Sequence, residues 1–145
     1  MKKFLFTVAI LCLMGISSAR VSRPRGIGVI LGDRTGLSFK YWNSSKLAAD
    51  AALSWNDGGL YLHADYLMHF SIASGRAWRL PVYLGLGSSV FLADNSSVGL
   101  RIPVGLNYIM TRMPFDFFLE IVPTMGLSDG MGFDTNVFGG LRFFF

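Results

Sequence analysis

The sequence predicts an all-β fold, namely an eight-stranded antiparallel up-and-down transmembrane β-barrel that follows a cleaved N-terminal signal peptide. Three observations favour this fold class. Segments in which long apolar residues alternate with small or polar residues recur along the chain, and turn-forming residues separate them. Only 15% of the residues are charged, and the mean hydropathy is +0.46. Beyond the N-terminus, no apolar run reaches the roughly 18 residues of a membrane-spanning helix.

The N-terminal segment 1–19 has the features of a secretory signal peptide. Two lysines begin it, an apolar run covers 4–16, and Ser17-Ser18-Ala19 offers small residues for cleavage. A membrane-spanning helix is the alternative, but the run is shorter than the roughly 20 residues required. Cys12 is the only cysteine and lies within this segment, so the mature chain can contain neither a disulfide nor a thiolate metal site.

The mature chain is close to neutral. Removing the two signal lysines from 13 basic residues leaves 11 against 9 acidic ones, a net charge of +2. The basic segment 20–25 then forms a short leader, which we expect in the periplasm. This small charge gives no reason to expect a nucleic-acid partner.

The first four strands are predicted at 26–31, 37–42, 47–55 and 60–70. In each of them every second residue belongs to an apolar phase, as expected for side chains that point alternately to the two faces of a sheet. Turn residues lie between them, and the third turn contains Asn-Asp-Gly-Gly, a strong hairpin signal because these residues tolerate positive φ.

The last four strands are predicted at 80–91, 98–108, 115–124 and 135–145. The segment 98–108 shows the cleanest alternation of all. Prolines occur inside three of the four strands, and proline cannot donate to a β-ladder, so we expect bulges or other irregularities at Pro81, Pro103 and Pro123. Eight strands are an even number, as expected for a bacterial barrel of this type.

The composition of the two phases predicts which one faces lipid. One phase is apolar and aromatic and carries no charged residue, whereas the other mixes small residues with a few charges. A water-facing surface would hold more long charged side chains and fewer glycines, so a soluble lipocalin-like barrel with an apolar interior is the less favoured alternative. We therefore expect the mixed phase in the lumen.

The lumen phase predicts a paired polar network rather than an open pore. Eight strands leave an interior that side chains fill, and buried charges are tolerable only when they are paired. Three cations, three carboxylates and one histidine make up the predicted network: Lys40, Asp50, His63, Asp65, Arg101, Glu120 and Arg142. Within it, Glu120→Ala is expected to leave Arg101 or Arg142 unpaired.

Aromatic and charged residues near the strand ends suggest how the barrel is placed in a membrane. Aromatic residues of the lipid phase would form interfacial girdles, namely Tyr41, Trp55, Tyr66, Phe70, Tyr108, Phe143 and Phe145. With both termini in the periplasm, the outer turns hold Asp33, Arg34, Asp57, Asp94 and Asp129, and the periplasmic turns hold Lys46, Arg76, Arg79 and Arg112. The basic side would then meet the anionic phosphates of the inner leaflet, and the acidic side would meet lipopolysaccharide with divalent cations.

The closing strand carries residues that we expect the barrel-assembly machinery to read. It ends in an aromatic residue, as closing strands of outer-membrane barrels commonly do, and its relevant positions are Gly140, Leu141, Phe143 and Phe145. This strand must pair with the glycine-rich segment 26–31 to seal the barrel. We expect that seam to be the least regular part of the structure.

Several segments resemble known proteins. They are GIGVILGDRTGLSFKYW, LHADYL, LPVYLGLG, VGLRIPVGLNY, PFDFFLEIVP and the terminal FGGLRFFF. Together they resemble the small eight-stranded outer-membrane barrels of the OmpX and OmpA-transmembrane-domain type, and more closely a family of small outer-membrane barrel proteins of diderm bacteria. The resemblance implies an integral, monomeric barrel among outer-membrane lipids and lipopolysaccharide. Short outer turns argue against the adhesin role of some members.

The function is less constrained than the fold. A structural or envelope-interaction role leads, and a narrow pore or a lipid-modifying enzyme are the alternatives. Ser54, His63 and Asp65 have the residue types of a catalytic triad. However, His63 and Asp65 lie two positions apart on one strand, and the lumen offers no path for a substrate. We therefore expect no catalytic residues. His63 and Asp65 lack further ligands for a metal, and no cofactor is expected.

Overall fold

The computed structural model describes residues 23–56, 58–94, 96–127 and 132–145. The expected signal peptide and residues 20–22 of the expected leader lie outside this part of the chain. Every regular element in the described part is a β-strand. No helix there is long and apolar enough to cross a membrane.

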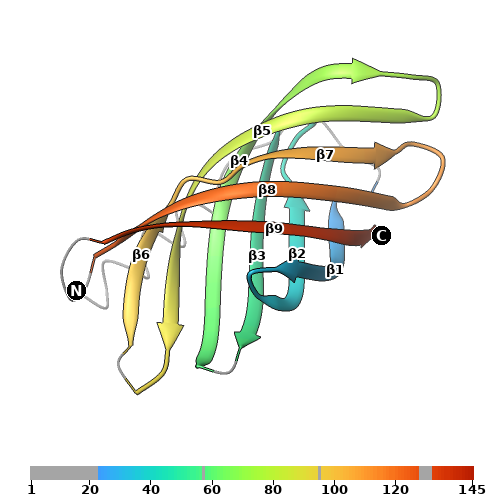
Figure 1. Cartoon of the computed structure of the whole chain (residues 1–145). Coiled ribbons are helices and arrows are strands. Elements are labelled where there is room, and N and C mark those ends of the chain that lie inside the picture. The colour runs from blue at the N-terminus through green and yellow to red at the C-terminus, as the bar shows by residue number, and fades with distance from the viewer. Residues whose placement is uncertain (1–22, 57, 95, 128–131) are drawn as a thin grey trace.

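The strands form one antiparallel sheet that closes on itself (Figure 1). From β1 to β5, and again from β8 to β9, consecutive strands pair with each other, and the first strand also pairs with the last. Nine strands occupy eight positions in the ring, because β6 and β7 follow one another between β5 and β8. The bounds are β1 Arg25–Gly32, β2 Thr35–Trp42, β3 Leu47–Asn56, β4 Gly59–Ser74, β5 Trp78–Leu92, β6 Ser97–Arg101, β7 Val104–Met110, β8 Phe115–Gly126 and β9 Phe133–Phe144.

The break between β6 and β7 corrects the expectation that 98–108 is the cleanest strand. Pro103 lies in the break and has no N–H for the ladder, although its carbonyl still accepts from the Gly85 N–H at 2.9 Å. The Ile102 N–H donates to the carbonyl of Pro123 at 3.0 Å. The register on β5 is the same on both sides of the break, so the chain continues in line and no residue is inserted.

The other two prolines also interrupt pairing, as the sequence predicts. Next to Pro81, the register between β4 and β5 shifts between Ser71 and Ala73, which is a β-bulge. Pro123 pairs in register with Thr135 on β9. On the other side of β8, the register with β6 ends at Thr124 and the register with β7 begins at Ile121, so Pro123 has no register partner there. The missing donors are therefore absorbed by local irregularities within a closed ring.

The seam between β1 and β9 is regular, which contradicts the expectation that it would be the least ordered part. Pairing runs without a shift from Gly26 opposite Phe144 to Gly32 opposite Phe138. Neither strand contains a proline between these positions, and Gly28 lets the two backbones approach closely. The irregular pairing lies instead along β4, β5, β6 and β7.

The two phases of the strands lie as predicted. In β2, Gly36, Ser38, Lys40 and Trp42 are buried, and the residues between them are exposed. The same alternation continues around the ring, so that charged side chains lie inside and large apolar side chains lie outside. This arrangement is the reverse of the apolar interior expected for a lipocalin-like barrel.

The expected girdle residues lie on the outer surface. Six of them are exposed, and Tyr66 is half-buried, where its hydroxyl accepts from Asn43 Nδ2 at 3.3 Å. Trp78 stacks on Tyr108 with ring centroids 6.0 Å apart, and Phe143 stacks on Phe145 at 6.4 Å.

A candidate functional site in the barrel interior

All seven residues of the predicted network point into the barrel. They come from six strands, which are β2, β3, β4, β6, β8 and β9, and their exposed fractions lie between 0% and 7%. The alternating pattern places them there, because each belongs to the inward phase of its strand. The side chains are Lys40, Asp50, His63, Asp65, Arg101, Glu120 and Arg142.

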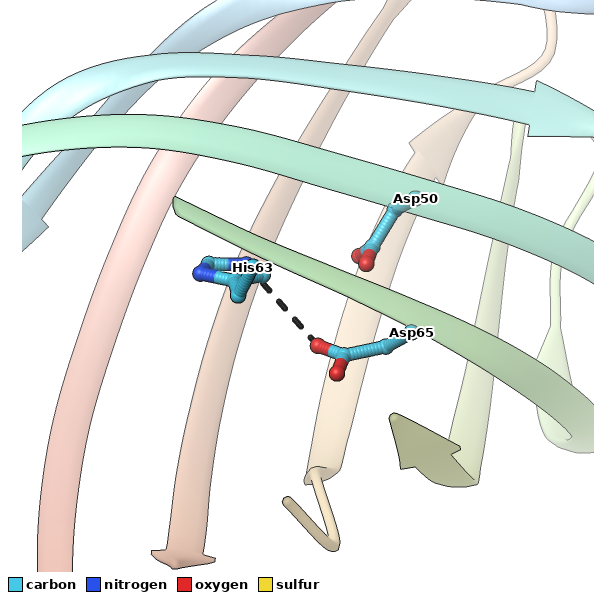
Figure 2. Close-up of side chains that lie close together, drawn as sticks. All are labelled: Asp50, His63 and Asp65. Atoms are coloured by element: carbon cyan, nitrogen blue, oxygen red, sulfur yellow. Dashed lines mark ion pairs between the residues drawn. The ribbon is translucent and has the colours of Figure 1, made fainter. Parts of the chain in front are cut away.

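Asp50, His63 and Asp65 gather on the wall formed by β3 and β4 (Figure 2). Asp50 lies directly opposite Asp65 in the strand register, and His63 Nε2 lies 3.8 Å from Asp65 Oδ2. The expectation that no further metal ligand stands near His63 and Asp65 is therefore wrong, because the neighbouring strand supplies Asp50. The triad written from the sequence is not assembled: Ser54 Oγ donates to the carbonyl of Tyr61 at 3.5 Å instead.

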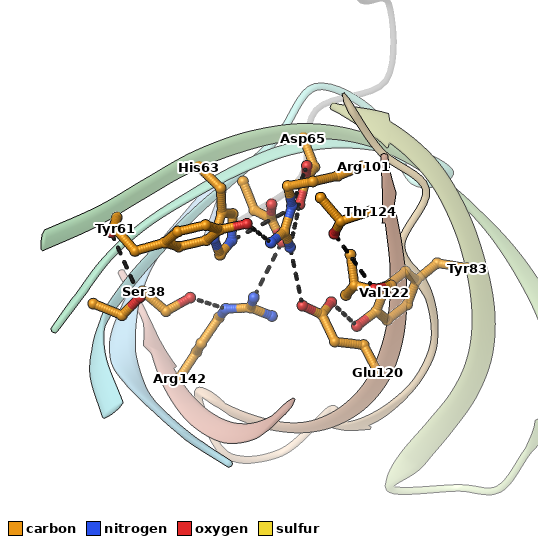
Figure 3. Close-up of polar contacts among 12 residues, drawn as sticks. Ser38, Tyr61, His63, Asp65, Tyr83, Arg101, Glu120, Val122, Thr124 and Arg142 are labelled. Atoms are coloured by element: carbon orange, nitrogen blue, oxygen red, sulfur yellow. Dashed lines mark hydrogen bonds and ion pairs between the residues drawn. The ribbon is translucent and has the colours of Figure 1, made fainter. Parts of the chain in front are cut away.

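Arg101 forms the most extensive contacts in the lumen (Figure 3). Its Nε donates to Asp65 Oδ1 at 3.0 Å, and its Nη2 donates to Asp65 Oδ2 at 3.0 Å. Its Nη1 donates to the hydroxyl of Tyr61 at 3.0 Å. This two-pronged pairing satisfies the guanidinium almost completely in a place where it is fully buried.

Glu120 has a different main partner from the one that the sequence suggested. The hydroxyl of Tyr83 donates to Glu120 Oε2 at 2.7 Å, whereas Arg101 Nη2 lies 3.7 Å from Glu120 Oε1. No ion pair joins Glu120 to Arg142 in the described structure. Glu120→Ala would therefore leave Tyr83 without its acceptor, while Arg101 would keep Asp65.

Arg142 lies at the centre of a second group. Its Nε donates to Ser38 Oγ at 2.9 Å, and its Nη2 donates to Asp50 Oδ2 at 3.3 Å. Asp116 lies directly opposite Arg142 on β8, with 4.0 Å between the closest nitrogen and oxygen. The guanidinium also stacks over the Phe118 ring at 3.8 Å, which is a cation–π contact.

In three of these contacts the partners are two strands apart and a glycine lies between them. Gly87 separates Asp65 from Arg101, and Gly105 separates Tyr83 from Glu120. A Cβ at Gly87 would meet the Asp65 carboxylate, and a Cβ at Gly105 would meet the Tyr83 phenol. The third case is Gly28, which separates Ser38 from Arg142. The lumen glycines thus leave room for side chains to meet across an intervening strand.

Lys40 and His69 form a pair near one end of the lumen. Lys40 Nζ lies 2.9 Å from His69 Nε2, and His69 Nδ1 lies 3.3 Å from the carbonyl of Lys46. A neutral imidazole that donates from Nδ1 and accepts at Nε2 satisfies both contacts. The Lys40 ammonium also lies 4.5 Å from the centre of the Trp42 ring.

One charged residue of the network was missed by the sequence reasoning. Asp116 is fully buried, and its Oδ2 accepts from Asn107 Nδ2 at 2.8 Å. Among the described residues of the buried class, the lumen therefore holds four carboxyl groups and three cations, not three of each. The signal was available, because Asp116 shares the inward phase of β8 with Glu120.

The charged turns have partly structural roles. Asp33 Oδ2 accepts from the Val137 N–H at 2.8 Å and so ties the first turn to β9. Arg34 stacks over the Tyr61 ring at 3.8 Å. Of the other predicted outer-turn acids, Asp94 is exposed. Asp57 and Asp129 lie outside the described residues.

A cavity lies at each end of the network. The cavity at the end shared by the start of β1 and the end of β9 has a volume of about 540 Å³, and arginines line it at Arg23, Arg79 and Arg112. The other has a volume of about 300 Å³ and is lined by Arg34 and Tyr61, among others. The two cavities share no lining residue.

Comparison with known proteins identifies the fold. No protein-family model matches the sequence. No curated protein sequence matches it either. Among solved structures, the N-terminal β-barrel domain of Pseudomonas aeruginosa OprF is similar, with a TM-score of 0.61 and 20% sequence identity over 85% of this chain and 98% of that domain. The likeness confirms the predicted small antiparallel barrel.

Proposed function

We propose that this chain is an integral outer-membrane β-barrel with a structural or envelope-interaction role, and that its polar network plugs the lumen. The observation that carries the proposal is the distribution of its side chains. Large apolar residues cover the outside of a closed ring, and charged residues fill the inside. Hydrocarbon around the barrel would suit that exterior, and closure would satisfy the backbone groups of every strand.

Membrane insertion is tested by fractionation of cells that express the full chain. We expect the protein in the outer-membrane fraction, and we expect its gel mobility to change on heating, as a folded barrel opens. Recovery of the folded protein in solution without detergent would contradict the proposal.

The plug is supported by the packing between the two cavities. Arg101, Asp65 and Glu120 are buried there, and their contacts join β4, β6 and β8 across the interior. An eight-stranded barrel leaves room for side chains rather than for a channel. These contacts favour a filled lumen over the narrow pore that remains the second candidate.

Conductance of the pure protein in planar bilayers distinguishes these two functions. We expect no sustained single-channel steps from the folded protein, because an ion would have to displace paired buried charges. Addition of detergent alone, at the same concentration, serves as the control. Reproducible steps that scale with the amount of folded protein would favour the pore.

The arginine-lined cavity supports an orientation with both termini in the periplasm. In the described structure Arg23, Arg79 and Arg112 form no ion pair with a carboxylate. On the periplasmic side these cations would lie near the anionic phosphates of the inner leaflet, which attract basic groups close to the membrane surface. Lipopolysaccharide would then surround the opposite end.

We propose that the exposed aromatic side chain of Phe145, which follows β9, is a recognition element for the assembly machinery. The Phe145 side chain is 57% exposed, so it contributes little to the packing of the folded barrel. We expect Phe145→Ala to reduce the amount of folded protein in the outer membrane of cells. The stability of the same variant refolded in vitro should change by no more than about 0.5 kcal/mol.

Phe133→Ala is the matched control for this experiment, because Phe133 is also an exposed aromatic residue on β9 and is 82% exposed. It should accumulate like the wild type. Equal accumulation of the Phe145 and Phe133 variants would show that the last residue is not recognised.

An enzymatic function is a weaker candidate, and we propose that the chain is not an enzyme. The contacts of Ser54 and His63 do not form a nucleophile and its base. Mass analysis of lipid A from cells with and without the protein tests this alternative. We expect unchanged masses, and a shift by an acyl chain would support lipid modification.

A further inference from the structure

The cluster on the β3–β4 wall brings together three residues of metal-binding type. Asp50, His63 and Asp65 each offer a ligand atom, and these atoms lie within 4.8 Å of one another (Figure 2). All three residues are at least nine-tenths buried. They come from adjacent strands in fixed register, so the wall of the barrel itself holds them together.

The protein contacts of this cluster leave specific atoms unsatisfied. Arg101 binds both oxygens of Asp65, but Arg142 binds only Oδ2 of Asp50. Asp50 Oδ1 and His63 Nδ1 are buried and have no hydrogen-bond partner. Buried polar atoms are nearly always paired, and two of the six buried side-chain atoms without a partner in the described residues lie in this cluster, where one ligand could contact both.

The two facing carboxylates of the cluster favour a cation as that partner. Asp50 and Asp65 lie opposite one another on the same face, an arrangement that is unfavourable for like charges. Within the cluster itself, Asp50 and Asp65 supply two carboxyl groups, and Arg101 and Arg142 each pair with one of them. A bound cation would lie between the two facing carboxylates and reduce the repulsion between them.

We propose that Asp50, His63 and Asp65 form a binding site for one divalent transition-metal cation of the Zn²⁺ type. Imidazole nitrogen together with carboxylate oxygen suits Zn²⁺, and three protein ligands are the usual number in a zinc site that keeps one open position. Ca²⁺ and Mg²⁺ favour sites made of oxygen ligands alone. Asp65 keeps its pairing with Arg101 and contributes a remaining lone pair. The site is independent of whether the barrel conducts ions.

Calorimetric titration of the folded barrel in detergent tests the proposal, with ZnCl₂ as the probe. We expect one Zn²⁺ per chain, with no displacement by excess MgCl₂. Asp50→Asn and His63→Gln should each weaken binding by about tenfold or more, since each removes one of three ligands. Asp116→Asn is the matched control, because Asp116 is a buried lumen carboxyl near Arg142 but outside the cluster, and it should bind Zn²⁺ like the wild type.

NMR of the two imidazoles gives a second readout that does not depend on affinity. Zn²⁺ should shift the ring signals of His63 and leave those of His69 in place, because His69 already contacts Lys40 and Lys46. If Asp50→Asn fails to fold, as judged by heat-dependent mobility, His63→Gln decides the question. Absence of a stoichiometric site, equal binding by His63→Gln, or equal loss in Asp116→Asn would overturn the proposal.

Discussion

Arg101→Met should destabilise the barrel by about 3–5 kcal/mol, the cost of removing one partner from a buried ion pair. The guanidinium is fully buried and contacts both oxygens of Asp65 and the hydroxyl of Tyr61. Methionine fills a similar volume but leaves the Asp65 carboxylate without a cation. Urea unfolding in detergent, followed by the heat-dependent gel shift, measures the loss.

Two further variants test whether the loss of stability comes from breaking the ion pair between Arg101 and Asp65. Arg112→Met removes an arginine from an exposed turn and should change stability by no more than about 0.5 kcal/mol. Adding Asp65→Asn to Arg101→Met should recover part of the loss, because residue 65 then no longer carries a charge without a partner. A loss in Arg101→Met as small as that in Arg112→Met would mean that water reaches the Asp65 carboxylate.

Gly87→Ala should cost about 1–3 kcal/mol although it adds a single methyl group. A Cβ at this position would meet the Asp65 carboxylate and the carbonyl of Ala64. Relief requires that Asp65 or the β4 backbone move, and either shift disturbs the pairing with Arg101. The same unfolding experiment measures the loss, and the barrel should still form.

Gly139→Ala is the control, because Gly139 is a strand glycine of the outward phase. A Cβ there lies 3.3 Å from the Phe118 carbonyl oxygen, a contact that a small shift relieves.

We also expect the stability losses of Gly87→Ala and Arg101→Met to be non-additive, since both act on the Asp65 carboxylate. Fully additive losses would indicate that the methyl group acts through the backbone alone.

The arrangement of the strands was predictable because a local property determines it. Side chains alternate with a period of two, so the residue types of β2 or β8 identify the inward face without knowledge of any neighbour. Turn residues marked the strand ends, and the prolines marked where pairing is interrupted. An irregularity was expected at Pro103, but not the division of the sixth strand into two, because apolar alternation continues through a position that lacks a donor.

The pairing inside the lumen was less predictable because it depends on the stagger between strands. Arg101 meets Asp65 only because Gly87 lies between them. The alignment of these three residues depends both on the register of β4 with β5 and on the register of β5 with β6. No local pattern reports the stagger of β4, β5 and β6. For the same reason, the role of Tyr83 as the donor to Glu120 and the position of Asp50 opposite Asp65 were not found in advance.

If the barrel is inserted in the outer membrane, as proposed, the contacts of Arg142 have a consequence for how it enters. Its acceptors Ser38 and Asp50 precede it by 104 and 92 positions in the chain. A chain with only some of its strands inserted would hold this guanidinium, or the Asp50 carboxylate, in hydrocarbon without its partner. Partly inserted states are therefore costly, and the first and last strands have to arrive together. Insertion and closure should form a single cooperative step, whose rate is set by the search for contacts that are distant in sequence.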